Sequence, residues 1–244
     1  MKLARPPERA MVLAAGKGLR LRPLTASRPK PLVEVAGRTM LDGVLDHLVE
    51  AGVGEVVVNA HHLGHMIEDH LRARAIPRIR FSHEEVLLET GGGVRKALPL
   101  LGAAPFYVIN GDVIWRDGKV AALERLAEAW NATLMDALLL LQPTASAVGY
   151  EGRGDFFMDQ LGHLRRRKEK EVAPFLFAGV QILAPALFAD APEGPFSLNL
   201  LYDRALCAGR LHGLRHDGSW YHVGTPEDLR RVEAALTPGA EPVT

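Results

Sequence analysis

A short apolar segment that ends in a glycine-bearing, cationic loop constrains this chain more than any other feature. Residues 10–15 are apolar without interruption, which is typical of a buried strand, and Gly16 and Gly18 follow at once. Glycines let the backbone approach phosphate oxygens closely, so that main-chain N–H groups can donate to them. Arg20 and Lys30 supply positive charge nearby. The stretch therefore predicts a binding site for a polyphosphate.

Two common phosphate-binding loops do not fit this stretch. The dinucleotide-binding fingerprint needs a third glycine three residues after the second, where this chain has Leu21. The Walker loop needs a Gly-Lys-Ser/Thr sequence after its first glycine, and the stretch does not contain one. The loop therefore belongs to another class of phosphate-binding site.

Apolar periodicity beyond the loop predicts alternating helices and strands. A helix is expected from residue 40 up to Gly52, which would cap its end, and strands are expected over 55–59 and 79–82. Such alternation is typical of a parallel sheet with crossover helices. The sequence therefore predicts an α/β fold.

Three successive glycines form the second informative stretch. Gly91 to Gly93 follow Glu89 and Thr90 and precede a helix expected over 94–101. Since consecutive glycines cost backbone entropy, we interpret them as bare backbone against which a flat ligand lies. A flexible loop without a ligand is the alternative interpretation.

A carboxylate follows the next expected strand, over residues 106–109. Asn110, Gly111 and Asp112 come at its carboxyl end, where open α/β sheets bind their ligands. A carboxylate at that edge suits Mg2+, which prefers oxygen ligands and is often held by few protein groups together with phosphates. An ordinary strand-end turn is the alternative, because these residue types also favour turns.

The second half of the chain is predicted to be richer in strands. Further strands are expected over 136–142, 175–183 and 220–225, and helices over 120–130, from Ser197 and from Thr225. The basic run over 165–168 indicates a solvated hairpin. His61 and His65 are four residues apart, as in some metal pairs, but the stretch lacks a clear third ligand, which favours an exposed polar face.

Composition limits the classes of partner. Lys and Arg together number 29, as do Asp and Glu, so net charge gives no reason to expect a nucleic acid or an anionic membrane. The single cysteine, Cys207, cannot form an internal disulfide, and no apolar stretch reaches the roughly 18 residues of a membrane span. We therefore expect a cytoplasmic protein that binds small anions, and a monomer.

The spacing of Gly16, Gly18 and Arg20, followed by Pro23-Leu24-Thr25 and by residues 29–32, resembles the signature of the sugar-1-phosphate nucleotidyltransferases. The resemblance implies a Rossmann-like three-layer fold with a mostly parallel mixed sheet. It also implies one domain with two halves between short ends: an extension over 1–8, a nucleotide-binding half over 9–115, a sugar-binding half over 116–236 and a tail over 237–244.

The resemblance implies metal-dependent transfer of a nucleotidyl group to a sugar 1-phosphate, with Mg2+ or Mn2+ as cofactor. Residues 87–102, 110–113, 152–156 and 220–229 are most similar to members that transfer a uridylyl group from UTP to N-acetylmuramate α-1-phosphate, an activity of peptidoglycan recycling. Two alternatives remain. The acceptor could be a glucose, mannose or heptose 1-phosphate, or the chain could be a non-catalytic regulatory domain that binds nucleotide sugars.

The same resemblance assigns roles to individual residues. Arg20 is expected to stabilise the departing pyrophosphate, Lys30 to bind the α-phosphate or the sugar phosphate, and Asp112 to bind the metal. Contacts to the nucleotide are implied at Ala14, Ala15, Gly16, Gly18, Glu84, Glu89, Thr90, Gly91 and Asn110. Contacts to the sugar are implied at Gly154, Asp155 and Gly179.

Two positions distinguish this chain from the pattern that it resembles. His222 stands where the resembling enzymes typically have an aspartate that is a second metal ligand, and imidazole suits Mn2+ or Zn2+ better than Mg2+. Either Asp112 holds the ion without His222, or the preferred metal differs, or His222 has another role. Glu84 lies near the position where relatives have a glutamine that contacts the base. A carboxylate only accepts hydrogen bonds, so it suits the N3–H donor of uracil. Glu84 therefore predicts a preference for UTP over CTP.

Overall fold

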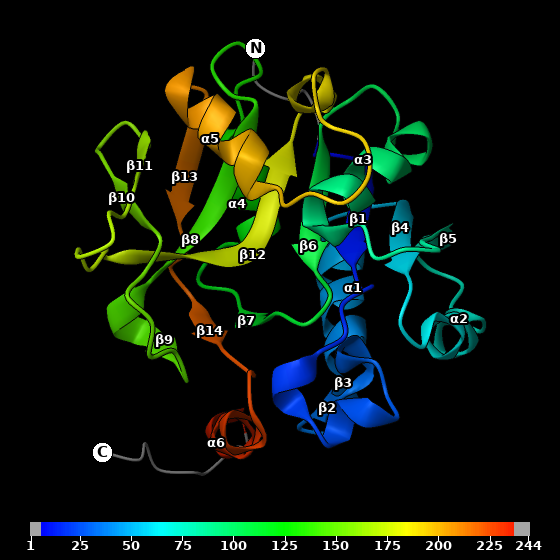
Figure 1. Cartoon of the computed structure of the whole chain (residues 1–244). Coiled ribbons are helices and arrows are strands. Elements are labelled where there is room, and N and C mark those ends of the chain that lie inside the picture. Colours follow the sequence, from blue (N-terminus) through cyan, green and yellow to red (C-terminus); the bar gives the residue numbers. More distant parts are fainter. Residues whose placement is uncertain (1–5, 237–244) are drawn as a thin grey trace.

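A nine-stranded mixed sheet runs through both halves of the chain in the computed structural model, which describes residues 6–236 (Figure 1). Four strands pair in parallel in the order β5, β4, β1, β6, and the antiparallel strand β12 joins β6 to β8 and β10. The predicted α/β class with a mixed sheet is confirmed. The strands are β1 (Arg9–Leu13), β4 (Glu55–Ala60), β5 (Arg78–His83), β6 (Phe106–Asn110), β8 (Ala137–Pro143), β10 (Phe156–Met158), β11 (Leu164–Arg166), β12 (Phe175–Leu183) and β13 (Leu211–Arg215).

Helices cover both faces of the sheet, which makes three layers (Figure 1). In β1, Ala10 and Val12 enter one core and Met11 enters the other. Because successive side chains of a strand point to opposite faces, a strand between two helical layers reads as an unbroken apolar run. The first core is shared with α1 (Met40–Glu50), α2 (Gly64–Leu71) and α4 (Ala122–Ala129), and the second with α3 (Glu89–Leu101) and α5 (Asn199–Cys207).

Two small sheets and a last helix lie beside the central sheet. Within α6 (Pro226–Leu236), Val232 is buried in a third core together with Leu21 and Tyr221. This core brings the C-terminal part of the chain against the loop that follows β1. The small sheets consist of β7 (Ile114–Arg116), β14 (Ser219–Tyr221) and β9 (Ala147–Val148), and of β2 (Glu34–Val35) and β3 (Arg38–Thr39).

Two predicted helix ends are confirmed by their local geometry. Gly52 follows α1 with a φ of +78°, a conformation that glycine adopts without strain. The Thr225 hydroxyl accepts a hydrogen bond from the Asp228 amide at 3.2 Å, which is the predicted cap of α6. Ser197 lies one position too early, because α5 begins after Leu198 and no side chain caps it there.

The structure corrects the expected loop at the three glycines. Helix α3 already begins at Glu89, so all three glycines lie inside it. A Cβ atom at Gly91 would lie 2.3 Å from the ring of Phe196, and one at Gly92 would lie 2.4 Å from the carbonyl oxygen of Gly194. Gly91 and Gly92 are therefore needed where α3 packs closely on the segment before α5. A contact between segments that are a hundred residues apart leaves no local signal in the sequence.

No helix within residues 6–236 is long and apolar enough to cross a membrane. The expected tail and most of the expected N-terminal extension lie outside the described residues. The predicted basic hairpin is formed by β10 and β11, where Arg165 makes an ion pair with Glu171 at 2.7 Å.

Candidate active site

The loop after β1 is folded back on itself and held by its own side chains. Gly18 has a φ of +59°, and a Cβ atom there would lie 3.0 Å from the Cβ of Lys30. The Thr25 hydroxyl donates to the Gly18 carbonyl oxygen at 2.7 Å. Glycine at position 18 therefore permits both the left-handed turn and the close passage of Lys30. The rest of the loop contains three short 3-10 helices, η1 (Leu19–Leu21), η2 (Leu24–Ala26) and η3 (Lys30–Leu32).

A cavity of about 640 Å3 opens at the carboxyl ends of β1 and β6. Its wall combines the glycine loop, the start of α3 and the end of β6, which places the ligand edge where the topology of an open α/β sheet requires it. Thr90 at the start of α3 accepts a hydrogen bond from the Leu198 amide at 2.9 Å, so this wall is tied to α5. The predicted residues in this wall are Ala14, Ala15, Gly16, Gly18, Arg20, Lys30, Glu89, Thr90, Asn110 and Asp112.

A second cavity of about 260 Å3 adjoins the first and shares part of its wall. Lys30 lies at this boundary, where its ammonium group donates to the Asp112 carboxylate at 2.7 Å. The structure therefore brings the cationic loop and the acidic strand end to one cleft. Residues common to both cavities are Arg20, Lys30, Asn110 and Asp112, and the second also contains the predicted Asp155, Gly179 and His222.

The second cavity also has lining residues that sequence reasoning did not assign. Tyr150 lies in its wall, and its hydroxyl oxygen accepts from the Gly154 amide at 3.0 Å. Trp220 also lines this cavity, and its indole nitrogen donates to the Ala178 carbonyl oxygen at 2.9 Å. Tyr150 belongs to no motif, and Trp220 opens the motif at 220–229 without an assigned role, so the fold decides the place of both rings in the cavity.

Three predicted site residues line neither cavity. Gly91 is inside α3, where its amide donates to the Phe196 carbonyl oxygen at 2.8 Å. Gly154 has a φ of +69°, and a Cβ atom there would lie 2.3 Å from the Ala173 carbonyl oxygen. Both glycines therefore allow close backbone packing next to residues that line the cavities, without lining a cavity themselves. The third such residue is Glu84.

Glu84 is only 5% exposed and faces protein donors. One carboxylate oxygen accepts from the Asn59 side-chain amide at 2.7 Å, and the other accepts from the Leu88 amide at 2.9 Å. The Asn59 carbonyl oxygen in turn accepts from the Ala14 amide at 2.7 Å. This corrects the expectation that Glu84 touches a base, because its carboxylate instead links the glycine loop to the segment before α3. Asn59 lines the first cavity and was missed, although it is a polar residue directly after the three valines of β4.

His222 borders the second cavity, where its ring stacks on that of Trp220 with centroids 5.9 Å apart. Burial lowers the pKa of His222, and the nearby charges of Lys30 and Arg20 lower it further. The neutral imidazole is therefore favoured near neutral pH, and in that form a ring nitrogen can accept a hydrogen bond or bind a transition metal.

The donor set at the cleft fits a divalent cation. Asp112 offers a carboxylate at the boundary of the two cavities, and His222 offers an imidazole in the wall of the second cavity. The carboxylate suits Mg2+, which commonly completes its coordination with phosphates and water, whereas the imidazole suits a transition metal.

The histidines on and before α2 do not gather ligands. His61 has Nδ1 at 2.9 Å from the Glu84 carbonyl oxygen, and within residues 6–236 neither His61 nor His65 belongs to a cluster with metal-binding geometry. A polar face is therefore the better interpretation, with His65 exposed and His61 half-buried.

The cleft and the fold together define a nucleotidyltransferase, and comparisons with known proteins agree. Residues 9–238 match the family model described as nucleotidyl transferase. The chain belongs to this family, whose members generally use a divalent metal.

Two relatives cover nearly the whole chain. N-acetylmuramate alpha-1-phosphate uridylyltransferase of Caulobacter vibrioides is 45% identical over 239 residues, which are 96% of this chain and 99% of that protein. The protein of the same name in Neisseria meningitidis serogroup B is 36% identical over 231 residues, 93% of this chain and 97% of the relative. The crystal structure of HddC from Yersinia pseudotuberculosis has a TM-score of 0.77 at 22% identity, covers 94% of this chain and 99% of its own, and shares the fold.

Proposed function

We propose that this chain transfers a uridylyl group from UTP to N-acetylmuramate α-1-phosphate and releases pyrophosphate. The observation that carries the proposal is the shared wall of the two cavities, which places Arg20, Lys30 and Asp112 between a nucleotide-sized and a sugar-sized space. Two relatives of nearly equal length that carry this activity in their names support the choice of substrates. Localisation in the cytoplasm and a monomeric state belong to the same proposal.

The proposed reaction forms one P–O bond and breaks another. A phosphate oxygen of the sugar 1-phosphate attacks the α-phosphorus of UTP, and the bond to the β-phosphate breaks, so that pyrophosphate leaves with the electron pair. Because the attacking oxygen is already anionic near neutral pH, the reaction needs no general base. The protein's main tasks are to neutralise charge and to align the two phosphates. Alignment supplies roughly 7–11 kcal/mol in favourable intramolecular models.

The first cavity is proposed to hold UTP. Backbone amides of the loop around Gly16 and Gly18 would donate to its phosphates, and Arg20 would stabilise the departing pyrophosphate. Lys30 would bind the α-phosphate or the sugar phosphate. Because Lys30 is already paired with Asp112 at 2.7 Å, an incoming phosphate competes with the carboxylate for the ammonium group. Bound Mg2+ would supply further charge neutralisation, held by Asp112 with or without His222.

The second cavity is proposed to hold the sugar, so that the 9–115 half of one domain binds nucleotide and the 116–236 half binds sugar. Asp155 is fixed there by the Phe177 amide, which donates to its carboxylate at 2.8 Å. Gly179 has a φ of +79°, and a Cβ atom there would lie 2.9 Å from the amide nitrogen of the Asn110 side chain. Glycine therefore lets β12 bend past the end of β6 and open space beside the shared wall.

The test is a substrate panel. Purified protein is incubated with UTP, Mg2+ and one of four acceptors, the 1-phosphates of N-acetylmuramate, glucose, mannose or a heptose, and pyrophosphate release is measured. We expect the highest kcat/KM with N-acetylmuramate α-1-phosphate. A higher value with another acceptor would replace the sugar in the proposal. Tight binding of UTP without pyrophosphate release for any sugar, with either Mg2+ or Mn2+, would instead indicate a non-catalytic binding domain.

A further inference from the structure

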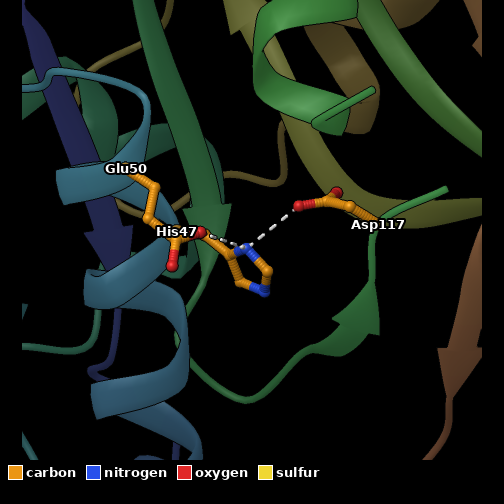
Figure 2. Close-up of side chains that lie close together, drawn as sticks. All are labelled: His47, Glu50 and Asp117. Carbon is orange, nitrogen blue, oxygen red and sulfur yellow. Dashed lines mark ion pairs between the residues drawn. The ribbon is translucent and has the colours of Figure 1, made fainter. Parts of the chain in front are cut away.

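A histidine and two carboxylates converge outside the cleft, where α1 meets the segment after β7. Figure 2 shows His47 and Glu50 on α1 and Asp117 on the opposite segment, with both carboxylates directed toward one ring nitrogen. The three candidate ligand atoms all lie within 4.8 Å of one another. None of these residues lines either cavity of the proposed active site.

Trp115 fixes the orientation of the imidazole. The rings of His47 and Trp115 stack with centroids 4.0 Å apart and an interplanar angle of 18°. Nε2 of His47 lies 3.3 Å from the Trp115 carbonyl oxygen, which can only accept a hydrogen bond. In the tautomer that donates Nε2–H to this carbonyl oxygen, Nδ1 has a free lone pair. Histidines that bind metals commonly donate their other N–H to a carbonyl or carboxylate in this way.

Nδ1 of His47 faces the two carboxylates. It lies 3.3 Å from Oδ2 of Asp117 and 3.8 Å from Oε2 of Glu50. The other oxygen of Asp117 accepts from the Trp115 indole at 3.0 Å and from the Ala122 amide at 2.9 Å, so this carboxylate is held in place. In that tautomer three acceptor atoms face one another, and either a proton on Nδ1 or a metal ion would compensate their charge.

We propose that Nδ1 of His47, Oδ2 of Asp117 and Oε2 of Glu50 bind a transition metal of the Zn2+ class, with water as a fourth ligand. Tetrahedral zinc with bonds of about 2.0–2.2 Å keeps its ligand atoms about 3.3–3.6 Å apart, and the His47–Asp117 distance of 3.3 Å fits this geometry. Glu50 has a side chain that is 69% exposed, so it can rotate to close its gap of 3.8 Å. One imidazole and two carboxylates match the ligand types of zinc sites with three protein ligands and a water.

The proposed site joins the two halves of the chain. His47 and Glu50 belong to α1 in the 9–115 half, whereas Asp117 begins the 116–236 half and holds the start of α4 through Ala122. A metal bound only by the folded chain stabilises it by mass action. The ion therefore acts as a clamp between the halves and takes no part in the proposed transfer reaction.

The experiment uses the whole chain, freed of metal with a chelator and then titrated with Zn2+ in excess Mg2+. We expect this site to bind one Zn2+ ion, measured by competition with a chromogenic chelator, and Co2+ in its place to give the visible absorption of tetrahedral coordination. The melting midpoint should rise by about 5–10 °C when free Zn2+ reaches a hundred times the dissociation constant.

Glu50→Gln and His47→Gln should each lower the affinity for Zn2+ at least tenfold and abolish the tetrahedral Co2+ spectrum. The exposed Glu50 position makes its variant safe for folding. His70→Gln is the matched control, because it removes another histidine–carboxylate contact, to Asp42 at 2.8 Å, and should leave binding unchanged. The proposal is overturned if the unmodified chain binds no Zn2+ here, which would mean that a proton is the bridging cation, or if both test variants retain full affinity.

Discussion

At the scale of single residues, the cleft is organised around one ion pair. The Lys30 side chain is 13% exposed and its ammonium group pairs with Asp112 at 2.7 Å, so charge and position are set before any substrate arrives. Arg20 borders both cavities, which places its guanidinium beside the boundary that Lys30 and Asp112 form. Preorganised charges of this kind are effective in catalysis because they are not reoriented during the reaction.

Replacing Arg20 by alanine should lower kcat by about 100- to 1,000-fold, a range typical of removing one group that stabilises developing charge. The leaving pyrophosphate would lose its guanidinium partner in the transition state. Steady-state kinetics of pyrophosphate release measure the effect. Arg22→Ala is the matched control, since Arg22 is exposed and lines neither cavity, and it should retain normal kcat. Equal losses in both variants would argue that net charge of the loop, and not position, matters.

Glu84→Gln should lower the free energy of unfolding by about 1–3 kcal/mol and raise KM for UTP. Both carboxylate oxygens accept from protein donors, Asn59 and Leu88, and an amide group must turn its NH2 toward one of these donors. Urea unfolding and kinetics with UTP and CTP measure the two effects, and the exposed Glu85→Gln is the control. We expect KM to rise for both nucleotides together. If the variant instead changed the preference between UTP and CTP and kept normal stability, the interpretation that Glu84 contacts the base directly would be supported.

At the scale of elements, α3 shows how tertiary packing overrides local propensity. Glycine is a poor helix former, yet this helix contains three in succession near its start. The missing side chains of Gly91 and Gly92 let the helix approach the segment around Phe196 and Gly194, and the Thr90 hydroxyl accepts from the Leu198 amide. The start of α3 is thereby fixed beside the first cavity.

Gly91→Ala should therefore destabilise the protein by about 1–3 kcal/mol, although alanine favours helices. The added Cβ atom would meet the Phe196 ring at 2.3 Å and its carbonyl oxygen at 2.8 Å. Gly43→Ala in α1 is the matched control, because a Cβ atom there would have no neighbouring atom within 4 Å outside its own helix turn. That variant should gain about 0.5–1 kcal/mol from helix propensity. Chemical denaturation measures the free energy of unfolding of both variants. A stabilised Gly91→Ala protein would contradict the packing argument.

At the scale of the whole molecule, buried histidines tie stability to pH. His212 and His216 are 4% and 1% exposed, and burial lowers the pKa of each. Burial also lowers the pKa of His222. The folded chain therefore keeps these rings neutral under conditions in which the unfolded chain, with histidine pKa values of about 6.5, begins to bind protons.

We expect the free energy of unfolding to fall as the pH drops from about 6.5 toward 5. In this window the unfolded state binds more protons than the folded state, so stability rises with pH, and it is fully present above pH 6.5. Each such histidine contributes a slope of at most about 1.4 kcal/mol per pH unit. Urea unfolding at several pH values measures it. His216→Gln should flatten the slope and the exposed His65→Gln should not. A slope that is the same in the His216 variant would remove this histidine from the explanation.

The sequence by itself determined the class of the fold and most of the residues that line the central cleft. Strands that are buried on both faces read as apolar runs, and the residues that follow them, such as Gly16 and Asp112, are delivered to the edge where ligands bind. These signals are local, because a strand, its stop and its first turn lie within about ten residues. The convergence of Arg20, Lys30 and Asp112 followed from topology once the strands were assigned.

Only the tertiary structure decided what the supporting residues do. Glu84 stands near the position of a base-reading side chain in the sequence, yet the Asn59 amide of a neighbouring strand captures its carboxylate. The glycines of α3 predicted a loop because the side chain that excludes a Cβ atom, Phe196, is a hundred residues away. The His47 cluster has no sequence motif, since its third member comes from the other half of the chain. Such contacts depend on how distant segments pack, and a single sequence carries no local record of that packing.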